Sequence, residues 1–301
     1  MAYANATTMK HFATKDIKNI VLVGSTKSGK TTLAETMMYE GGTLQRRGSI
    51  EEGNTASDYT ELEKEKGYSI YASLLHTVWR DTKINMIDTP GNDNFIGELL
   101  EGLRAADTVV MVLNAAHGVE IGTEIIWRHV KASGKPVVLV ANQMDHEKAD
   151  YDKLLEEATA LLGAAVIPMQ FPYNQGPGFD SVVDLLKMTM YKFKKDGGRP
   201  DKLAIPADVH TQAAQWHNTL VEAAAENDES LMEKYFEQGA LDEDELRQGI
   251  RLGMMKGAIF PLFVASAKQN MGSGRMMGFI GNVCPTAADA PVLPTTEGAE
   301  V

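Results

Sequence analysis

One octapeptide constrains this chain more than any other feature. Residues 24–31 read Gly-Ser-Thr-Lys-Ser-Gly-Lys-Thr and fit the pattern G-x-x-x-x-G-K-[ST]. They follow an apolar run, Ile20–Val23, and precede a helical pattern that starts at Thr31. In that strand–loop–helix context, backbone N–H groups cradle phosphate oxygens and the helix N-terminus adds a favourable dipole. A chance match in a glycine-rich turn is disfavoured because all three anchor residues stand in the right context. The pattern therefore predicts a phosphate-binding loop.

The residue types in the loop predict their roles. The lysine of such a loop reaches the β- and γ-phosphates, and the hydroxyl after it ligates Mg²⁺. Lys30 and Thr31 hold these two positions, and we expect Lys30 to act in catalysis as well as in binding. The residues of this loop that we expect to contact a nucleotide are Gly24, Lys27, Ser28, Gly29, Lys30, Thr31 and Thr32.

Composition excludes several classes of protein. A net charge of −12 argues against binding nucleic acid by bulk electrostatics, so we expect no sequence-specific nucleic-acid partner. A single cysteine, Cys284, excludes an internal disulfide framework and fits a reducing compartment. No stretch approaches the length of a membrane span, and residues 1–15 show no signal peptide. We expect a cytoplasmic monomer without a membrane partner.

The order of the apolar runs predicts an α/β fold. From residue 18 to about 170, short apolar runs alternate with helical stretches, which is typical of a mostly parallel sheet with helices on both faces. The expected strands are Ile20–Val23, Ser73–Trp79, Ile84–Ile87, Thr108–Leu113, Val137–Ala141 and Val166–Met169. The expected helices are Thr31–Tyr39, Phe95–Ala105, Glu120–Ala132 and Glu147–Leu162. Residues 41–67 are polar and aperiodic, and a connection that long is usually functional or mobile.

From about residue 171 the pattern changes. Glycines and prolines interrupt it, and helices are expected at Asp208–Ala225 and Asp242–Lys256. A buried strand, Ile259–Val264, and a closing helix, Gly274–Val283, then return to the first pattern. We therefore expect a P-loop nucleotide-binding domain with an inserted α+β subdomain. The expected boundaries are 1–17 for an N-terminal extension, 18–170 and 259–284 for the nucleotide-binding domain, 171–258 for the insert and 285–301 for a linker.

Two further segments follow predicted strands at positions suited to binding a metal ion and a base. Asp88-Thr89-Pro90-Gly91 follows the strand Ile84–Ile87, and side chains at such strand ends face the ligand crevice. There Asp88 can hold Mg²⁺ through water, and the Gly91 N–H can meet a γ-phosphate during catalysis. Asn142-Gln143-Met144-Asp145 follows the strand Val137–Ala141, where the Asp145 carboxylate can accept N1–H and N2–H of guanine. Adenine offers no such pair of donors, so Asp145 selects GTP over ATP, although it can also cap a helix.

The base would be enclosed by residues from two loops. Asn142 would link its loop to the phosphate loop, and we expect the next residue, Gln143, to contact the nucleotide as well. A backbone N–H of Ser266-Ala267-Lys268, after the last strand, could bind guanine O6. That tripeptide is weak evidence alone, but segments in this order, each at a strand end, form a specific pattern.

At this point the chain resembles the GTP-binding domain of translational GTPases, most closely elongation factor G, over nearly all of residues 16–301. Residues 63–70 (Glu-Lys-Glu-Lys-Gly-Tyr-Ser-Ile) resemble the family's first switch, with Ser69 in place of its Mg²⁺-ligating threonine. Residues 231–237 and 241–246 resemble its inserted subdomain. The resemblance implies GTP/GDP and Mg²⁺ as cofactors and a ribosome-dependent GTPase that acts in translocation. It also implies that the chain stops where a second domain would begin.

The residues that differ from the family pattern lie mostly at positions that the resemblance implies for GTP hydrolysis. Asn92 stands where the family places the histidine that positions the attacking water, and asparagine cannot become a cation. Thr26 and Tyr68 replace two flanking apolar residues, Lys27 replaces an aspartate, and Gln143 replaces a lysine whose stem covers the base. Contacts to phosphate, Mg²⁺ and guanine are mostly kept. The pattern predicts a divergent paralogue with weakened GTP turnover, in which Asn92, Lys30 and Gly91 are the catalytic candidates.

Two alternatives stay open. The protein could be a non-hydrolysing guanine-nucleotide-binding ribosome factor, or a ribosome-protection or release factor of the same superfamily. Between Glu222 and Glu245 there are ten acidic residues and one lysine, Lys234. We interpret this stretch as a solvated helical face. The resemblance suggests instead a contact for a ribosomal stalk protein.

Overall fold

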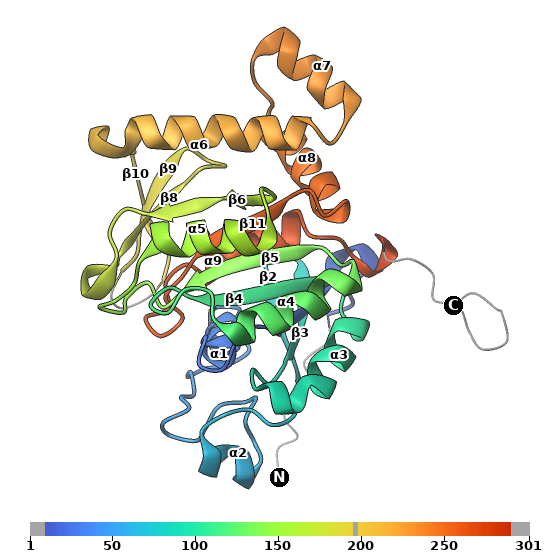
Figure 1. Cartoon of the computed structure of the whole chain (residues 1–301), viewed down its shortest axis with the longest axis vertical. Helices are drawn as coiled ribbons and strands as arrows, with labels where there is room; N and C mark the ends of the chain where they lie inside the picture. Colours follow the sequence, from blue (N-terminus) through green and yellow to red (C-terminus); the bar gives the residue numbers. More distant parts are fainter. Residues whose placement is uncertain (1–9, 195–197, 290–301) are drawn as a thin grey trace, which may run out of the picture.

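A seven-stranded, mostly parallel sheet forms the larger part of the structure, a computed structural model that describes residues 10–194 and 198–289 (Figure 1). Its strand order is β2-β3-β1-β4-β5-β11-β6, and only β2 runs antiparallel to its neighbour. The strands are β1 (Ile17–Val23), β2 (Ser73–Trp79), β3 (Thr82–Asp88), β4 (Thr108–Asn114), β5 (Val137–Asn142), β6 (Val166–Pro168) and β11 (Phe260–Val264). The predicted α/β class with a mostly parallel sheet is confirmed.

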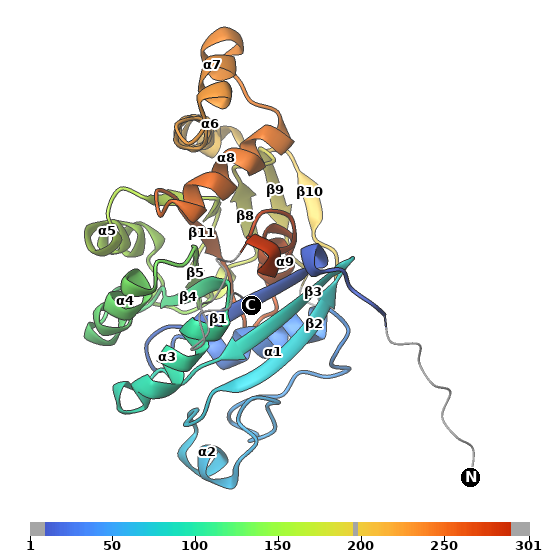
Figure 2. The same cartoon turned by 90° about the vertical axis from the view of Figure 1, so that its right-hand side faces the viewer.

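Helices cover both faces of this sheet, as the alternating pattern predicted. In Figure 2, α1 and α9 lie on one face, and α3, α4 and α5 lie on the other. Their bounds are α1 (Lys30–Glu40), α3 (Ile96–Ala105), α4 (Ile121–Ser133), α5 (Tyr151–Leu162) and α9 (Ser273–Asn282). Strands β4 and β5 are buried along their whole length because both of their faces are covered, which explains their continuous apolar runs.

A second sheet is antiparallel and has the order β10-β9-β8-β7. Its strands are β7 (Gln170–Pro172), β8 (Ser181–Asp184), β9 (Thr189–Lys192) and β10 (Asp201–Leu203). The remaining long helices, drawn in orange at the top of Figure 1, are α6 (Ala207–Ala225), α7 (Glu229–Gln238) and α8 (Glu243–Met255). Helices α6 and α8 match the two predicted helices, whereas α7 and the positions of these strands were not predicted.

The predicted strand Val166–Met169 is wrong at its C-terminal end. The chain changes sheets at Met169, whose N–H donates to Leu262 O at 2.9 Å and whose carbonyl accepts from Leu185 N at 2.9 Å. Strand β6 ends at Pro168, and β7 begins at Gln170 in the other sheet. The apolar run continues through the crossing because both sheets bury it, so hydrophobicity alone could not locate the change.

The polar segment 41–67 is referred to below as the first-switch segment, because it leads into residues 63–70, which resemble a first switch. Two buried glutamates anchor it. Glu35 of α1 accepts from Gly48 N at 2.8 Å and from Ala56 N at 2.5 Å. Glu63 belongs to a short helix, α2 (Glu61–Lys66), that the aperiodic sequence did not reveal. Its carboxylate closes a capping box with Thr60 and also accepts from the N–H groups of Ile70 and Tyr71.

The charge state of Glu63 fits this anchoring role. Burial alone would raise the pKa of Glu63, but hydrogen bonds from Thr60 and from the backbone of Ile70 and Tyr71 outweigh it, so the pKa is lowered overall. An ionised Glu63 thus fixes the backbone beside Ser69.

None of the helices in residues 10–194 and 198–289 combines the length and the apolarity that a membrane span needs. The predicted linker 285–301 falls mostly outside the described residues, as does the first half of the predicted N-terminal extension.

Candidate nucleotide-binding site

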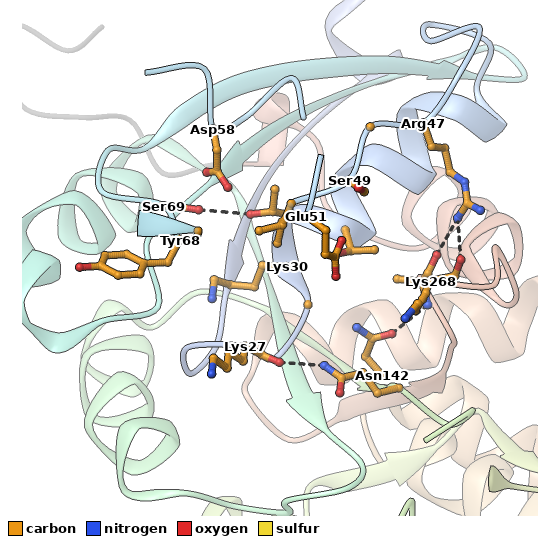
Figure 3. A pocket seen from close by; sticks show the side chains of 18 of the residues that line it. Lys27, Lys30, Arg47, Ser49, Glu51, Asp58, Tyr68, Ser69, Asn142 and Lys268 are labelled. Carbon is orange, nitrogen blue, oxygen red and sulfur yellow. Dashed lines mark hydrogen bonds between the residues drawn. The ribbon is translucent and has the colours of Figure 1, made fainter. Parts of the chain in front are cut away.

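A cavity of about 1490 Å³ opens where the parallel strands end, and it collects most of the residues that the sequence singled out (Figure 3). Among the predicted site residues, those that line it are Lys27, Gly29, Lys30, Thr31, Thr32, Ser69, Gly91, Asn92, Asn142, Gln143, Asp145, Ala267 and Lys268. Four others do not line it but lie behind the lining residues, at Gly24, Ser28, Asp88 and Ser266. The first-switch segment supplies one wall, from Gln45 to Glu51.

The phosphate loop holds its lysine in place by backbone contacts. Lys30 is buried, and its Nζ donates to Gly24 O at 2.9 Å and to Ser25 O at 3.1 Å. Burial lowers the pKa of Lys30 to about 8, against the opposing effect of Asp88 and Asp58. The ammonium group is therefore poorly solvated, and phosphate oxygens would relieve this.

Gly91 fits tightly against the same loop. A Cβ at this position would lie 2.5 Å from Lys30 Nζ and 2.8 Å from Gly24 O. Only a residue without a side chain lets the backbone after Asp88 approach the phosphate loop so closely. This placement fits the expectation that the Gly91 N–H meets a terminal phosphate.

Oxygen atoms gather beside Lys30 in a pattern that suits a hard cation. Thr31 Oγ1 donates to Asp88 Oδ2 at 2.7 Å and lies 3.2 Å from Ser69 Oγ, and Ser57 Oγ donates to Asp88 Oδ2 at 2.6 Å. Asp88 is fully buried; burial raises its pKa, although hydrogen bonds from Ser57 and Thr31 oppose the rise. The three residues predicted to bind Mg²⁺ are therefore neighbours.

Two buried carboxylate oxygens here lack a partner among the described residues, Asp88 Oδ1 and Asp58 Oδ1. A buried oxygen without a hydrogen-bond donor is costly, and a divalent cation or its water shell would satisfy both atoms. The donor set of hydroxyls and carboxylates thus fits Mg²⁺. Asp58 and Ser57 were not predicted, because they lie in the aperiodic first-switch segment.

The pKa of Asp58 leads to a testable prediction. Burial raises the pKa of Asp58 from 3.8 to about 6, and the nearby Asp88 and Glu63 add to the rise. The folded state therefore holds this proton more tightly than the unfolded chain, so the stabilisation is complete below about pH 4 and is lost as pH rises through 6. Near neutral pH without metal, Asp58→Asn should raise the free energy of unfolding by about 1–3 kcal/mol.

Thermal unfolding in EDTA, near neutral pH and at about pH 5, checks this prediction. The advantage of Asp58→Asn should shrink at the lower pH. The exposed Asp93→Asn serves as control and should show no such advantage. With GDP and Mg²⁺ added, the parent should be the more strongly stabilised protein. A variant that is less stable than the parent in EDTA near neutral pH would contradict this reading of Asp58.

The opposite end of the cavity has the features needed to recognise a base. Asp145 Oδ1 accepts from Ser266 Oγ at 2.7 Å and Oδ2 from Gln269 Nε2 at 3.3 Å, which fixes the plane of the carboxylate. Asn142 Nδ2 donates to Ser28 O at 2.9 Å, and its Oδ1 accepts from Ala267 N at 3.0 Å. Asn142 thus links the phosphate loop to the loop of Ser266, Ala267 and Lys268, referred to below as the guanine loop.

Gln143 stands where the resemblance implies a lysine, and its side chain contacts the phosphate loop. Its Nε2 donates to Lys27 O at 2.7 Å, and Asn114 Nδ2 donates to the same carbonyl at 3.4 Å. Lys27 and Gln143 both have positive φ, at 66° and 64°. The Gln143 side chain, shorter than that of lysine, therefore supports the phosphate loop in its left-handed turn. The sequence did not predict this contact.

Asp145→Asn should change the base that is bound. The new amide would repel N1–H of guanine but could donate to the C2 carbonyl of xanthine, so GDP affinity should fall and XDP affinity should rise, each by about tenfold or more. Titrations of parent and variant with GDP, XDP and ADP measure the effect. Glu147→Gln, which removes an exposed charge from the same cavity wall, is the matched control. A parent that binds ADP as tightly as GDP would refute the role of Asp145.

The end of the cavity around Asn92 departs most from the arrangement that the resemblance implies for hydrolysis. Asn92 lines the cavity together with Thr26 and Tyr68, but its Oδ1 accepts from Asn94 N at 3.0 Å and caps the short 3-10 helix Asp93–Phe95. In residues 10–194 and 198–289, no histidine other than His146 lines this cavity, and His146 lies beside Asp145 at the base end.

Comparison with known proteins agrees with this geometry. The elongation factor Tu GTP binding domain family matches residues 15–286, which is most of the chain. A crystal structure of a protein from Thermus thermophilus is similar with a TM-score of 0.85 and 29% sequence identity, over 90% of this chain and 41% of that one. The chain thus spans less than half the length of that protein. On the strength of the family match and the phosphate-loop cavity, the chain belongs to the elongation factor Tu GTP-binding domain family of translational GTPases, which bind and hydrolyse GTP.

Proposed function

We propose that this chain is the GTP-binding domain of an elongation factor G-like translation factor that acts on the ribosome in translocation and hydrolyses GTP slowly. The observation that carries the proposal is the pairing of an intact binding end with an altered hydrolytic end in one cavity. Lys30, Thr31 and Asp145 line this cavity at points that suit phosphate, metal and guanine, whereas Asn92 lines it where the resemblance implies a water-positioning histidine.

The chain's own residues account for binding. Lys30 would exchange its carbonyl partners for phosphate oxygens, and Gly91 leaves room for the terminal phosphate beside it. Thr31, Ser69 and Asp88 would hold Mg²⁺, with Asp58 in support. When bound, Mg²⁺ would neutralise charge that develops between the β- and γ-phosphates.

Weak hydrolysis follows from Asn92. Its carboxamide is engaged in capping a 3-10 helix, and it cannot carry a proton as a histidinium would. This favours, as a second candidate, a guanine-nucleotide-binding ribosome factor that works through conformational change with little catalysis. A ribosome-protection or release factor of the same superfamily has no specific observation in its favour.

A ribosomal stalk protein is a further proposed partner of the intact factor. Helices α7 and α8 carry acidic side chains, and Phe236 of α7 is 79% exposed. Some of the acids are already paired, since Lys234 contacts Glu245 and Arg247 contacts Glu243. Of the cellular setting, we propose a cytoplasmic protein that is monomeric off the ribosome.

Phosphate release in the presence and absence of ribosomes tests the proposal, with the longest natural form of the protein and standard elongation factor G as reference. The proposal predicts GTP binding, stimulation by ribosomes and a rate far below the reference. A ribosome-independent rate would contradict the proposed role in translation. A rate equal to that of the reference would contradict the weakened catalysis.

A further inference from the structure

One arginine connects the first-switch segment to the guanine loop. Arg47 Nη1 donates to Ala267 O at 2.9 Å and to Lys268 O at 3.1 Å, and it lies 3.3 Å from Thr36 Oγ1 (Figure 3). The guanidinium also lies over the ring of Tyr39, with its carbon 5.9 Å from the ring centroid. Arg47 is partly buried and lines the nucleotide cavity, so its position is defined on several sides.

These contacts fix one peptide group. Ala267 O accepts from Thr36 Oγ1 at 2.9 Å and from Asn270 N at 3.2 Å as well as from Arg47, so both of its lone pairs are used. A trans peptide holds its N–H opposite its C=O, and the N–H paired with Ala267 O belongs to Lys268. The Lys268 N–H therefore points away from Arg47 and Thr36.

The Lys268 N–H is also free for a ligand. The Ala267 N–H is already used by Asn142, whereas none of the hydrogen bonds between described residues uses the N–H of Lys268. A charged donor on the carbonyl side polarises the peptide and strengthens the N–H as a donor. Both ends of this peptide lie in the cavity wall beside Asp145.

We propose that Arg47 is a positioning residue for base recognition, which presents the Lys268 N–H to the O6 atom of a bound guanine. This inference rests on the proposed guanine-nucleotide function. Because Arg47 belongs to the first-switch segment, any movement of that segment that withdraws the guanidinium also removes its two hydrogen bonds to the guanine loop. Base affinity and the position of the first-switch segment are thereby coupled.

A lysine of the same segment provides a control. Lys64 is exposed and pairs with Glu61 at 3.1 Å. It shares the charge and the segment with Arg47 but is not among the residues that line the cavity. Surface pairs of this kind contribute little, so Lys64→Ala should change nucleotide binding by less than about twofold.

The experiment compares the affinities of the parent, Arg47→Ala, Arg47→Lys and Lys64→Ala for GDP and for 6-thio-GDP, in which a weakly accepting sulfur replaces O6. Arg47→Ala should weaken GDP binding by about tenfold, because it removes hydrogen bonds from a charged donor. The loss should be clearly smaller for 6-thio-GDP, because Arg47 acts through the atom that has been replaced. Arg47→Lys should recover part of the GDP affinity.

Each outcome decides the question. Equal losses for the two nucleotides would show that Arg47 only stabilises the loop, and GDP affinity equal to that of the parent would remove any role; either result overturns the inference. Melting curves without nucleotide show whether the variants are folded, and if Arg47→Ala is not, Arg47→Lys decides by the same comparison. A parent that does not bind GDP would instead overturn the proposed function.

Discussion

Lys30→Ala is expected to weaken GDP and GTP binding by roughly a hundredfold to several thousandfold, because it removes a buried cation that faces the phosphates. The fold should persist. Burial lowers the pKa of Lys30 to about 8, so near neutral pH the folded protein carries a poorly solvated charge whose removal relieves strain rather than creating it. Calorimetric titration with GDP measures the affinity, and melting curves without nucleotide report on the fold.

Lys27→Gly is the comparison variant for this experiment. Lys27 belongs to the same loop and carries the same charge, but it is exposed, and glycine tolerates its φ of 66°. Its loss should weaken binding by no more than about tenfold, because solvent screens an exposed charge. If Lys30→Ala bound GDP as tightly as the parent, with matching melting curves, the phosphate-loop assignment would be wrong.

Asn92→His is expected to accelerate ribosome-stimulated GTP hydrolysis. A positioned proton-transfer group is typically worth about 10²–10⁴ in rate. Recovery should be partial, because Thr26, Lys27 and Tyr68 also differ from the family pattern around the same end of the cavity. The assay is phosphate release at saturating GTP, with parent and variant compared on the same ribosomes.

Asn94→His controls for the mere addition of an imidazole. Asn94 lies two residues away, is exposed, and contributes only its backbone N–H to the Asn92 cap. Its variant should hydrolyse GTP at the rate of the parent. A parent that already matches standard elongation factor G would show that Asn92 suffices, and the view of a weakened catalyst would have to be abandoned.

The main sheet could be predicted from the sequence because burial on both faces leaves a direct signal. The apolar runs of β1, β4 and β5 and the residues that follow them locate the strand ends, and parallel strands bring those ends to one edge. This is why Lys30, Asp88 and Asp145, far apart in the sequence, were all expected at one site, and why they meet around one cavity.

The first-switch segment could not be predicted in the same way. Its path depends on the buried carboxylates of Glu35 and Glu63, which accept backbone N–H groups from positions up to 21 residues away. Such contacts leave no periodicity in the sequence. Asp58 and Arg47 lie on this path, so the roles that we propose for them in metal binding and base recognition rest on contacts visible only in the folded structure.

A titration of the parent protein with GDP and with ADP, each with Mg²⁺ and then in EDTA, tests the central claim most directly. The cavity described here should bind GDP much more tightly than ADP, by at least about a hundredfold, because only guanine offers both donors to Asp145. GDP binding should also weaken in EDTA, because Asp58 and Asp88 are then left without a cation. Equal affinity for the two nucleotides, or no binding of either, would contradict the account.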